Sequence, residues 1–291
     1  MIEMKDLTVQ FRNGTKAISN INMKIESGIY GLLGENGAGK TTLMRVLTTI
    51  LKPTHGQVVL NNIELTDASY VEIQKIIGYL PQELGLYPGL TVRDSLEYMG
   101  GLAGLKKNEC NKRIDYYLEK TSLTSHQKKK NRQLSGGMKR RVGLVQAMLH
   151  DPQILIVDEP TTGLDPEERI RIRNLLVDFS KNRIVLFSTH VVEDLAVTCN
   201  TLAILRKGEL IYDGNIANLL EQAKEHVWMC KLQSDEQLAY LQQRFKLSTK
   251  QHTQNGIEVK IISDKKPEIP CRQIDATLED AYIDIMNKLE Q

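Results

Sequence analysis

The residues best suited to chemistry lie in the segment GENGAGKTT, residues 34–42. Its glycines, lysine and threonine follow the spacing G-x-x-x-x-G-K-[ST]. Such glycines let the backbone fold around phosphate groups with its N–H groups pointing inward. Lys40 then supplies positive charge to the β- and γ-phosphates, and Thr41 supplies a hydroxyl to Mg²⁺. An apolar segment precedes this loop and a helix-like segment follows it, so we predict a phosphate-binding loop here.

Two neighbouring carboxylates end a second apolar segment, ILIVDEP. Ligands of open α/β sheets bind at the carboxyl ends of the strands, where Asp158 and Glu159 would lie. Asp158 is suited to hold Mg²⁺ through water. Glu159 is suited to orient or deprotonate an attacking water, as phosphoryl transfer to water requires. Alone, the pair would equally fit a solvated strand end; together with the phosphate loop, we favour the chemical roles.

Two further polar residues carry weaker signals. His190 ends the apolar segment RIVLFST, and Gln82 lies in YLPQE. A single histidine is usually a surface or core residue, but this one is expected at the same sheet edge, within reach of a γ-phosphate. Gln82 alone would be an ordinary loop residue.

A second anion-binding pattern occurs in NRQLSGGMKRR, residues 131–141. Ser135 and two glycines precede a basic, helix-like run. The free N–H groups and positive dipole end of a helix start attract an anion. The chain therefore has two candidate phosphate-binding segments.

The elements expected to hold these residues alternate between apolar strands and helices. This alternation predicts an α/β fold with a mostly parallel sheet covered on both faces. Helices are predicted at Gly137–Leu149 and from about Pro166. Thr91 and Asp94 have capping-box spacing, so a helix begins there, and residues 91–130 are mostly helical in pattern. At the N-terminus, MKDLTVQF alternates apolar and polar residues, as a half-buried strand does.

Composition limits the class of protein. The chain has 291 residues, 41% of them hydrophobic, which fits one large domain or two unequal ones and excludes global disorder. With 38 basic and 36 acidic residues, the net charge of +2 gives no general attraction to nucleic acid or anionic lipid. The N-terminus does not resemble a signal peptide, and no uncharged apolar run reaches about 18 residues, so we expect no membrane crossing.

The four cysteines are widely spaced. None forms a CxxC pair, so a zinc site is not expected. Because cysteines are so sparse, we expect no disulfides and predict that all four are reduced thiols. They are Cys110, Cys199, Cys230 and Cys271.

The character of the sequence changes at about Glu221. The remainder is polar, with short strand-like pieces, VWMCKL and GIEVKII, and a final segment TLEDAYIDIMNKL. Thr277 and Asp280 again have capping-box spacing ahead of a helical pattern. We predict a small α/β appendage.

The segments GENGAGKTT, YLPQ, LSGGMKRR, ILIVDEP, TGLDP and STH, in this order, resemble the ATP-binding cassette (ABC) ATPases over roughly residues 2–220. The resemblance implies a P-loop NTPase fold with a mostly parallel core sheet and an N-terminal antiparallel β subdomain. It also implies a helical subdomain at about 88–150. The expected domains are 1–220, the nucleotide-binding domain, and 221–291, a C-terminal accessory domain.

The resemblance also implies roles for individual residues. Glu159 would be the catalytic base, assisted by His190 and Gln82. Phe11 would stack on adenine, although tyrosine is commoner in relatives and a plain surface or core role is the alternative. Mg²⁺ would be bound by Thr41, Gln82 and Asp158. ATP would be bound by Gly34, Glu35, Asn36, Gly37, Ala38, Gly39, Lys40, Thr41 and Thr42. A second copy's ATP would be bound by Ser135, Gly136 and Gly137, with Asp165 across the subunit contact.

Three patterns resemble one branch of the family, and one of them is the segment IGYLPQELGLYPGLTVRDSLEYMGGLAGL. Met138 replaces the common glutamine, as in the exporter ATPases that often carry LSGGMKRR, and the terminal TLEDAYIDIM is similar to theirs. That branch includes drug, antibiotic and sodium exporters with a separate membrane subunit. The resemblance thus implies a cytoplasmic ATPase that forms a homodimer and is held at the membrane by a polytopic permease.

Two other functions are weighed against export. Non-transport relatives that act in translation usually carry two cassettes, and DNA-maintenance relatives carry long coiled coils, whereas residues 82–135 leave room only for a small helical insert. A small-molecule kinase would leave the LSGGM segment and Glu159 unexplained. The basic run KKKNR could be a nucleic-acid patch, but a solvated face is the simpler interpretation, and no nucleic-acid partner is expected. The sequence does not identify the cargo.

Overall fold

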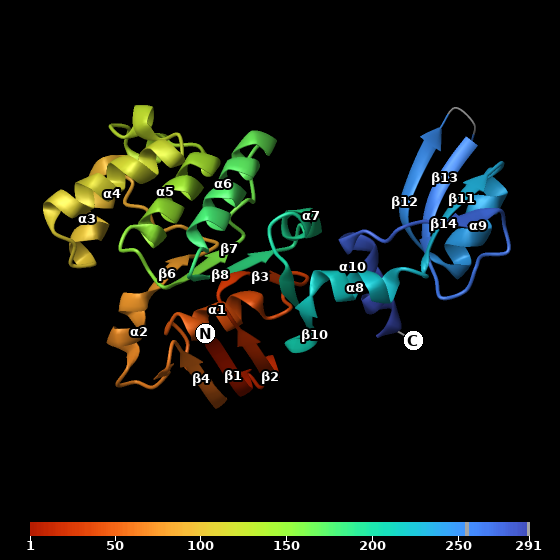
Figure 1. The fold of residues 1–291 in the computed structure, drawn as a ribbon, viewed down its shortest axis with the longest axis horizontal. Helices are drawn as coiled ribbons and strands as arrows, with labels where there is room; N and C mark the ends of the chain where they lie inside the picture. The colour runs from red at the N-terminus through yellow and green to blue at the C-terminus, as the bar shows by residue number, and fades with distance from the viewer. Residues whose placement is uncertain (254–255, 290–291) are drawn as a thin grey trace. The chain divides into compact units, whose positions relative to one another are not determined.

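The computed structural model describes residues 1–253 and 256–289 (Figure 1). It divides the chain into two compact units, Met1–Asp213 and Gly214–Gln291. The expected boundary lay slightly later, between residues 220 and 221. The units are taken in turn below.

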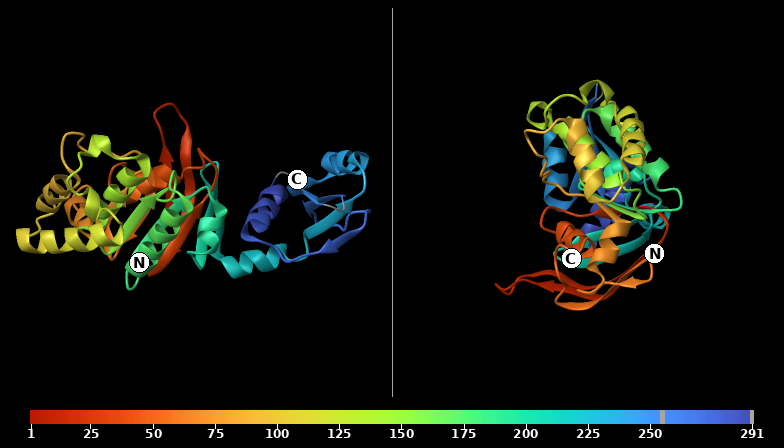
Figure 2. Two further views of the ribbon diagram at one scale, coloured as in Figure 1. Left: turned by 90° about the horizontal axis from the view of Figure 1, so that it is seen from above. Right: turned by 90° about the vertical axis from the view of Figure 1, so that its left-hand side faces the viewer.

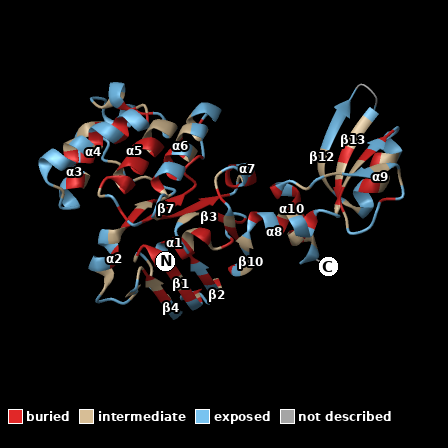
Figure 3. Cartoon of the chain, viewed as in Figure 1, coloured by how far each residue is buried: buried red, intermediate tan, exposed pale blue. Residues whose placement is uncertain are grey.

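A six-stranded sheet forms the centre of the first unit, in the order β10-β9-β3-β8-β7-β6. The four pairings from β9 to β6 are parallel. Every residue of β7 and β8 is buried, which explains why their sequences are continuous apolar runs (Figure 3). The strands are β3 (Gly28–Leu33), β6 (Ile77–Leu80), β7 (Ile154–Asp158), β8 (Ile184–Thr189), β9 (Thr201–Arg206) and β10 (Glu209–Asn215).

A second, antiparallel sheet has the order β2-β1-β4-β5. Apolar residues of β1, such as Ile2 and Met4, are buried in one core with Leu43 and Leu47 of α1 and with residues of the central sheet. This is the antiparallel subdomain that the family resemblance implied. The elements are β1 (Ile2–Gln10), β2 (Lys16–Ile25), β4 (His55–Leu60), β5 (Ile63–Glu64), α1 (Lys40–Leu47) and α2 (Tyr70–Ile76).

Three helices pack together beside the central sheet, yellow to green in Figures 1 and 2. α3 (Val92–Leu102) begins with the predicted capping box, in which the Asp94 N–H donates to Thr91 Oγ1 at 3.1 Å and the Thr91 N–H donates to Asp94 Oδ2 at 3.3 Å. α4 (Lys107–Lys120) and α5 (Gly136–Met148) complete the group, and α5 also contacts β6. α6 (Pro166–Phe179) and α7 (Val192–Ala196) follow β7 and β8.

The second unit contains an antiparallel sheet of order β12-β13-β11-β14. Leu238 and Leu241 of one helix pack on Val259 and Ile261 of the sheet, which gives this unit its own core. The predicted strands VWMCKL and GIEVKII and the capped final helix are all present. The elements are α8 (Ile216–Ala223), β11 (Val227–Leu232), α9 (Asp235–Arg244), β12 (Lys246–Thr253), β13 (Gly256–Ile262), β14 (Cys271–Gln273) and α10 (Leu278–Lys288).

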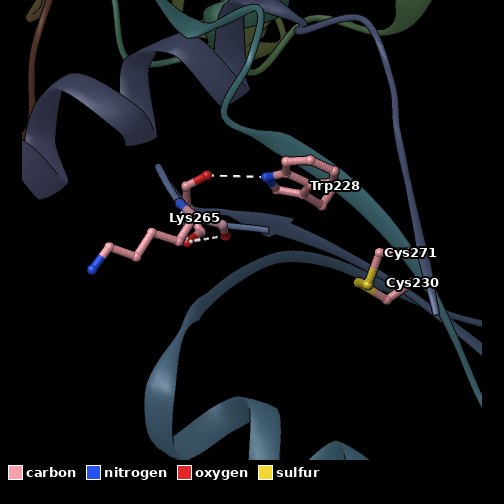
Figure 4. Close-up of a disulfide and its surroundings, with 5 residues drawn as sticks. Trp228, Cys230, Lys265 and Cys271 are labelled. Atoms are coloured by element: carbon pink, nitrogen blue, oxygen red, sulfur yellow. Dashed lines mark hydrogen bonds between the residues drawn. A yellow bond between two sulfur atoms is a disulfide. The ribbon is translucent and has the colours of Figure 1, made fainter. Parts of the chain in front are cut away.

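One expectation about the cysteines is wrong. Cys230 and Cys271 form a disulfide, whereas only Cys110 and Cys199 are free (Figure 4). The cause is the register of the sheet: β11 and β14 are antiparallel neighbours with Cys230 directly opposite Cys271, and their Cα atoms are 4.1 Å apart. Since the two cysteines are 41 positions apart in sequence, their spacing gave no sign of this pairing.

Candidate nucleotide-binding site

The glycine-rich loop connects β3 to α1 and depends on its glycines. Gly39 has a φ of 107°, and a Cβ atom there would lie 2.6 Å from the backbone oxygen of Ala17. Gly34 is equally constrained, because its Cβ would lie 2.5 Å from the backbone oxygen of Leu205. α1 then begins at Lys40, so the loop ends at the N-terminus of a helix. Free backbone N–H groups at such a position favour a phosphate.

The Lys40 side chain is buried within this loop. Its ammonium donates hydrogen bonds to the backbone oxygens of Gly34, at 2.5 Å, and Glu35, at 3.0 Å. Burial lowers the pKa of Lys40, and the negative charges of Glu159, Asp158 and Glu35 oppose this effect. The ammonium is thus positioned in the loop beside carboxylates of the sheet edge, where it can meet a phosphate.

Oxygen atoms that could bind a cation lie around Thr41, the residue after Lys40. Thr41 Oγ1 donates to Asp158 Oδ2 at 3.0 Å, and Ser188 Oγ donates to Asp158 Oδ1. Gln82 lines the same cavity, whose volume is about 610 Å³. Hydroxyl, carboxylate and amide oxygens are the ligands that Mg²⁺ prefers. The predicted residues Thr41, Gln82 and Asp158 therefore fit a magnesium ion; Ser188 was not foreseen, although it lies two residues before His190 at the end of β8.

Glu159 and His190 are brought together at the ends of β7 and β8. His190 Nδ1 lies 2.8 Å from Glu159 Oε1, and Thr162 Oγ1 donates to Glu159 Oε2 at 3.1 Å. The Glu159 N–H donates to the Ser188 carbonyl at 3.1 Å and helps fix a turn in which Glu159 has a φ of 51°. Glu159 is 5% exposed and lines the cavity. The His190 side chain is 47% exposed and does not line the cavity, but it contacts Glu159. Two hydrogen-bond partners therefore orient the carboxylate.

Arg140 of α5 holds the segment that carries Gln82. Its Nη1 donates to the backbone oxygens of Pro81, at 2.7 Å, and Gln82, at 2.8 Å. Burial lowers the pKa of Arg140, while Asp158 and Glu159 oppose that shift. We did not foresee this contact; its only sequence signal was the basic run of LSGGMKRR. It connects the start of α5 to the Gln82 loop.

One wall of the cavity is formed by residues 11–17, where the chain turns from β1 into β2. Phe11, which is 43% exposed, lines the cavity as the stacking hypothesis requires. Of the predicted loop residues, six line it directly, and Gly34, Glu35 and Ala38 form the rest of the loop. The six are Asn36, Gly37, Gly39, Lys40, Thr41 and Thr42. Wall residues that sequence reasoning missed are Thr15, Lys16, Ala17 and Lys207.

The predicted residues at the starts of α5 and α6, like His190, do not line this cavity. Ser135 caps α5 by accepting from the Met138 N–H at 3.2 Å, and Asp165 caps α6 by accepting from the Glu168 N–H at 3.0 Å. Ser135, Gly136 and Asp165 are exposed, and Gly137 is half-buried. The second anion-binding pattern is therefore not used by the chain's own phosphate loop.

Comparison with known proteins identifies the family. The family model described as ABC transporter matches residues 18–162. The ABC transporter ATP-binding protein NatA of Bacillus subtilis is 32% identical over 242 residues, which cover 80% of this chain and 98% of NatA. The chain belongs to the ABC transporter ATP-binding proteins. It is accordingly an ATP-binding subunit of an ABC transporter and an ATP hydrolase with the cassette fold.

Other members of the family are also similar. The methionine import ATP-binding protein MetN of Geobacillus kaustophilus is 33% identical over 236 residues, which cover 78% of this chain and 69% of MetN. The solved structure of the cassette MJ0796, a dimer in a post-hydrolysis state bound to ADP and Pi, has a TM-score of 0.69 and 27% identity. That match covers 74% of this chain and 98% of MJ0796. In the part of the chain that the structure describes, no helix has both the length and the apolar character needed to cross a bilayer.

Proposed function

We propose that this cassette ATPase drives a separate exporter permease by closing a homodimer around ATP. The observation that carries the proposal is the exposed start of α5. Ser135 and Gly136 present a helix N-terminus to solvent, away from the cavity that contains Lys40. Such a terminus attracts phosphate oxygens. A second copy can bring its own ATP to this surface, and MJ0796 offers a dimeric example within the fold.

Each half of the dimer would contribute different contacts to one ATP. The loop Gly34–Thr42 and Lys40 bind the phosphates, and Phe11 stacks on adenine. The partner's α5 start binds the γ-phosphate, and Asp165 lies across the subunit contact. Binding energy that depends on both copies is gained only in the closed state, so ATP shifts the equilibrium toward closure. Hydrolysis removes the γ-phosphate link and lets the dimer reopen.

A magnesium ion bound with ATP would be held by Thr41, Asp158 through water, and Gln82. It would neutralise phosphate charge during transfer. Glu159 is the general base that takes a proton from the attacking water, and His190 orients this carboxylate and contacts the γ-phosphate. The 2.8 Å contact between His190 Nδ1 and Glu159 Oε1 supports this division of roles. Gln82 lies in a loop and lines the cavity, so its side chain is suited to sense the γ-phosphate.

The permease and the direction of transport belong to the same proposal. LSGGMKRR and the terminal TLEDAYIDIM favour the exporter branch, whereas MetN is named for import. We propose a peripheral position on the cytoplasmic face of the membrane, where the permease's cytoplasmic helices would contact the segment 82–88 and α3–α5. The hydrogen bonds of Arg140 to Pro81 and Gln82 would carry movement of α5 to that segment.

Two steps test the proposal. The tagged protein is captured from detergent-solubilised host membranes, and its partners are identified by mass spectrometry. Recovery of one polytopic membrane protein at matching abundance is expected; ribosomal or DNA-repair proteins without a membrane partner would favour the non-transport alternative. The captured complex is then reconstituted in vesicles with the ATPase outside. ATP-dependent accumulation of solutes from host culture medium is expected for an exporter, and ATP-dependent efflux of preloaded solutes would indicate import.

A further inference from the structure

A buried polar network lies next to the catalytic pair and is not part of the nucleotide cavity. Thr161 Oγ1 donates to Asp194 Oδ2 at 2.6 Å, and Arg173 Nη1 donates to Asp194 Oδ1 at 2.9 Å. Thr161 is 1% exposed and Asp194 is 2% exposed, while 21% of the Arg173 side chain is exposed. None of these three side chains lines the cavity that holds Lys40 and Glu159.

The network joins the two chain segments that carry the catalytic pair. Thr161 lies two residues after Glu159, in the connection from β7 to α6. Asp194 lies four residues after His190, on α7. The contact between Thr161 and Asp194 is therefore a second bridge that runs alongside the direct contact between Glu159 and His190. Arg173 attaches this bridge to α6, the helix that begins immediately after Asp165.

The connection from β7 to α6 needs such an attachment. It bends through left-handed backbone at Glu159, with a φ of 51°, and at Gly163, with a φ of 75°. Between these bends the chain is neither helix nor strand. Pro160 and Thr161 are the buried residues between them, and the Thr161 hydroxyl gives this segment a direct link to α7.

The chemistry of the network favours positioning over simple stability. A buried carboxylate must be compensated by hydrogen bonds and an opposite charge, and the net stabilisation is small compared with apolar packing. Both carboxylate oxygens of Asp194 are used, and its backbone carbonyl accepts from Thr198 Oγ1 as well. Directional contacts on both oxygens fix one arrangement of the three segments, which apolar side chains would not specify.

We propose that Asp194 is a positioning residue for ATP hydrolysis. Through Thr161 and Arg173 it fixes the segment from Glu159 to Asp165 against α7, and so sets the Glu159 carboxylate relative to His190 and the attacking water. Displacements of about 1 Å in an active site can reduce the rate on the order of 100-fold. Because the network does not line the nucleotide cavity, its loss acts on kcat and leaves ATP affinity nearly unchanged.

The test compares Asp194→Asn, Thr161→Val and Thr161→Ser with the unmodified protein. Asp194→Asn removes the charge at nearly constant shape, Thr161→Val removes the hydroxyl, and Thr161→Ser keeps it. For Asp194→Asn and Thr161→Val we expect kcat to fall at least about tenfold while the KM and Kd for ATP change less than about twofold. Thr161→Ser is expected to retain most of the activity. Asp151→Asn, which breaks the surface pair with Arg183 at 2.6 Å, is the matched control and should keep its kcat.

Two results would overturn the proposal. One is a normal kcat in Asp194→Asn and Thr161→Val, even with a lowered melting temperature, because the network would then be structural only. The other is a parallel loss of kcat and ATP affinity, with Thr161→Ser as defective as Thr161→Val, because the nucleotide site itself would then be disturbed. If Asp194→Asn fails to fold, the two Thr161 variants decide between these outcomes.

Discussion

Replacing Glu159 by glutamine tests the proposed role of Glu159 as the catalytic base separately from the other functions of the site. The glutamine amide keeps the size of the side chain, and its oxygen can still accept from Thr162 Oγ1, which lies 3.1 Å from Glu159 Oε2. The change removes the negative charge and the ability to take a proton from water. Because the rest of the cavity is unaltered, Glu159→Gln should bind ATP as the unmodified protein does.

The expected loss follows from the role of a general base. Such a group typically contributes about 10²–10⁴-fold to the rate. At about 1.36 kcal/mol for each factor of ten, the activation barrier should rise by about 2.7–5.4 kcal/mol. The near-complete burial of Glu159 and its two side-chain partners favour the upper part of this range, since water cannot readily substitute for a carboxylate held in that position.

The assay is phosphate release at saturating ATP and magnesium, with ATP affinity measured by titration calorimetry. Glu167→Gln is the matched control, because this carboxylate lies on α6, is 84% exposed and pairs only across one helical turn with Arg171. We expect Glu167→Gln to keep its kcat within about twofold. A Glu159→Gln protein that retains more than a tenth of the activity, or that loses ATP affinity in proportion to activity, would refute the assignment of Glu159 as the base.

Three further predictions concern other residues. Lys40→Ala should weaken ATP binding about 10- to 100-fold in the same titration, since charged hydrogen bonds contribute about 1.5–3 kcal/mol, and unchanged affinity would contradict the role of Lys40. Arg140→Leu should lower kcat about tenfold in the phosphate-release assay, because the Gln82 segment loses two part-buried hydrogen bonds; an unchanged kcat would show that this segment is held by other contacts. Cys271→Ser should lower the unfolding free energy of residues 214–291 by about 4 kcal/mol in urea, given the 41-residue separation of the disulfide, and coincident unfolding curves would contradict it.

Local signals predicted much of the fold. The buried strand β7 was recognised because a strand covered on both faces is apolar at every position, and ILIV before Asp158 has that pattern. The helix starts after Thr91 and Thr277 were recognised because a capping box lies within four consecutive residues. Strand β14 was missed, since it has only three residues and no pattern of its own.

Contacts between distant segments were harder to predict. Arg140 meets Pro81 and Gln82 across nearly sixty residues of sequence, with separations of 59 and 58, and nothing in the basic run indicates which of its members is buried. Asp194 meets Thr161 only because β7 and β8 are parallel neighbours whose following segments meet at one sheet edge. The residues of the phosphate loop were predictable because a continuous spacing encodes them, whereas these contacts depend on the tertiary arrangement.

The central claim is that ATP joins two copies through the start of α5. The direct test is the molar mass of Glu159→Gln in solution, measured by light scattering with ATP, with ADP and without nucleotide. The account predicts 33.0 kDa without nucleotide or with ADP, and twice that mass with ATP. It also predicts that adding Ser135→Arg to this variant abolishes the ATP-dependent dimer without loss of ATP binding. A protein that stays monomeric with ATP, or a dimer that forms regardless of nucleotide and of Ser135→Arg, would contradict the claim.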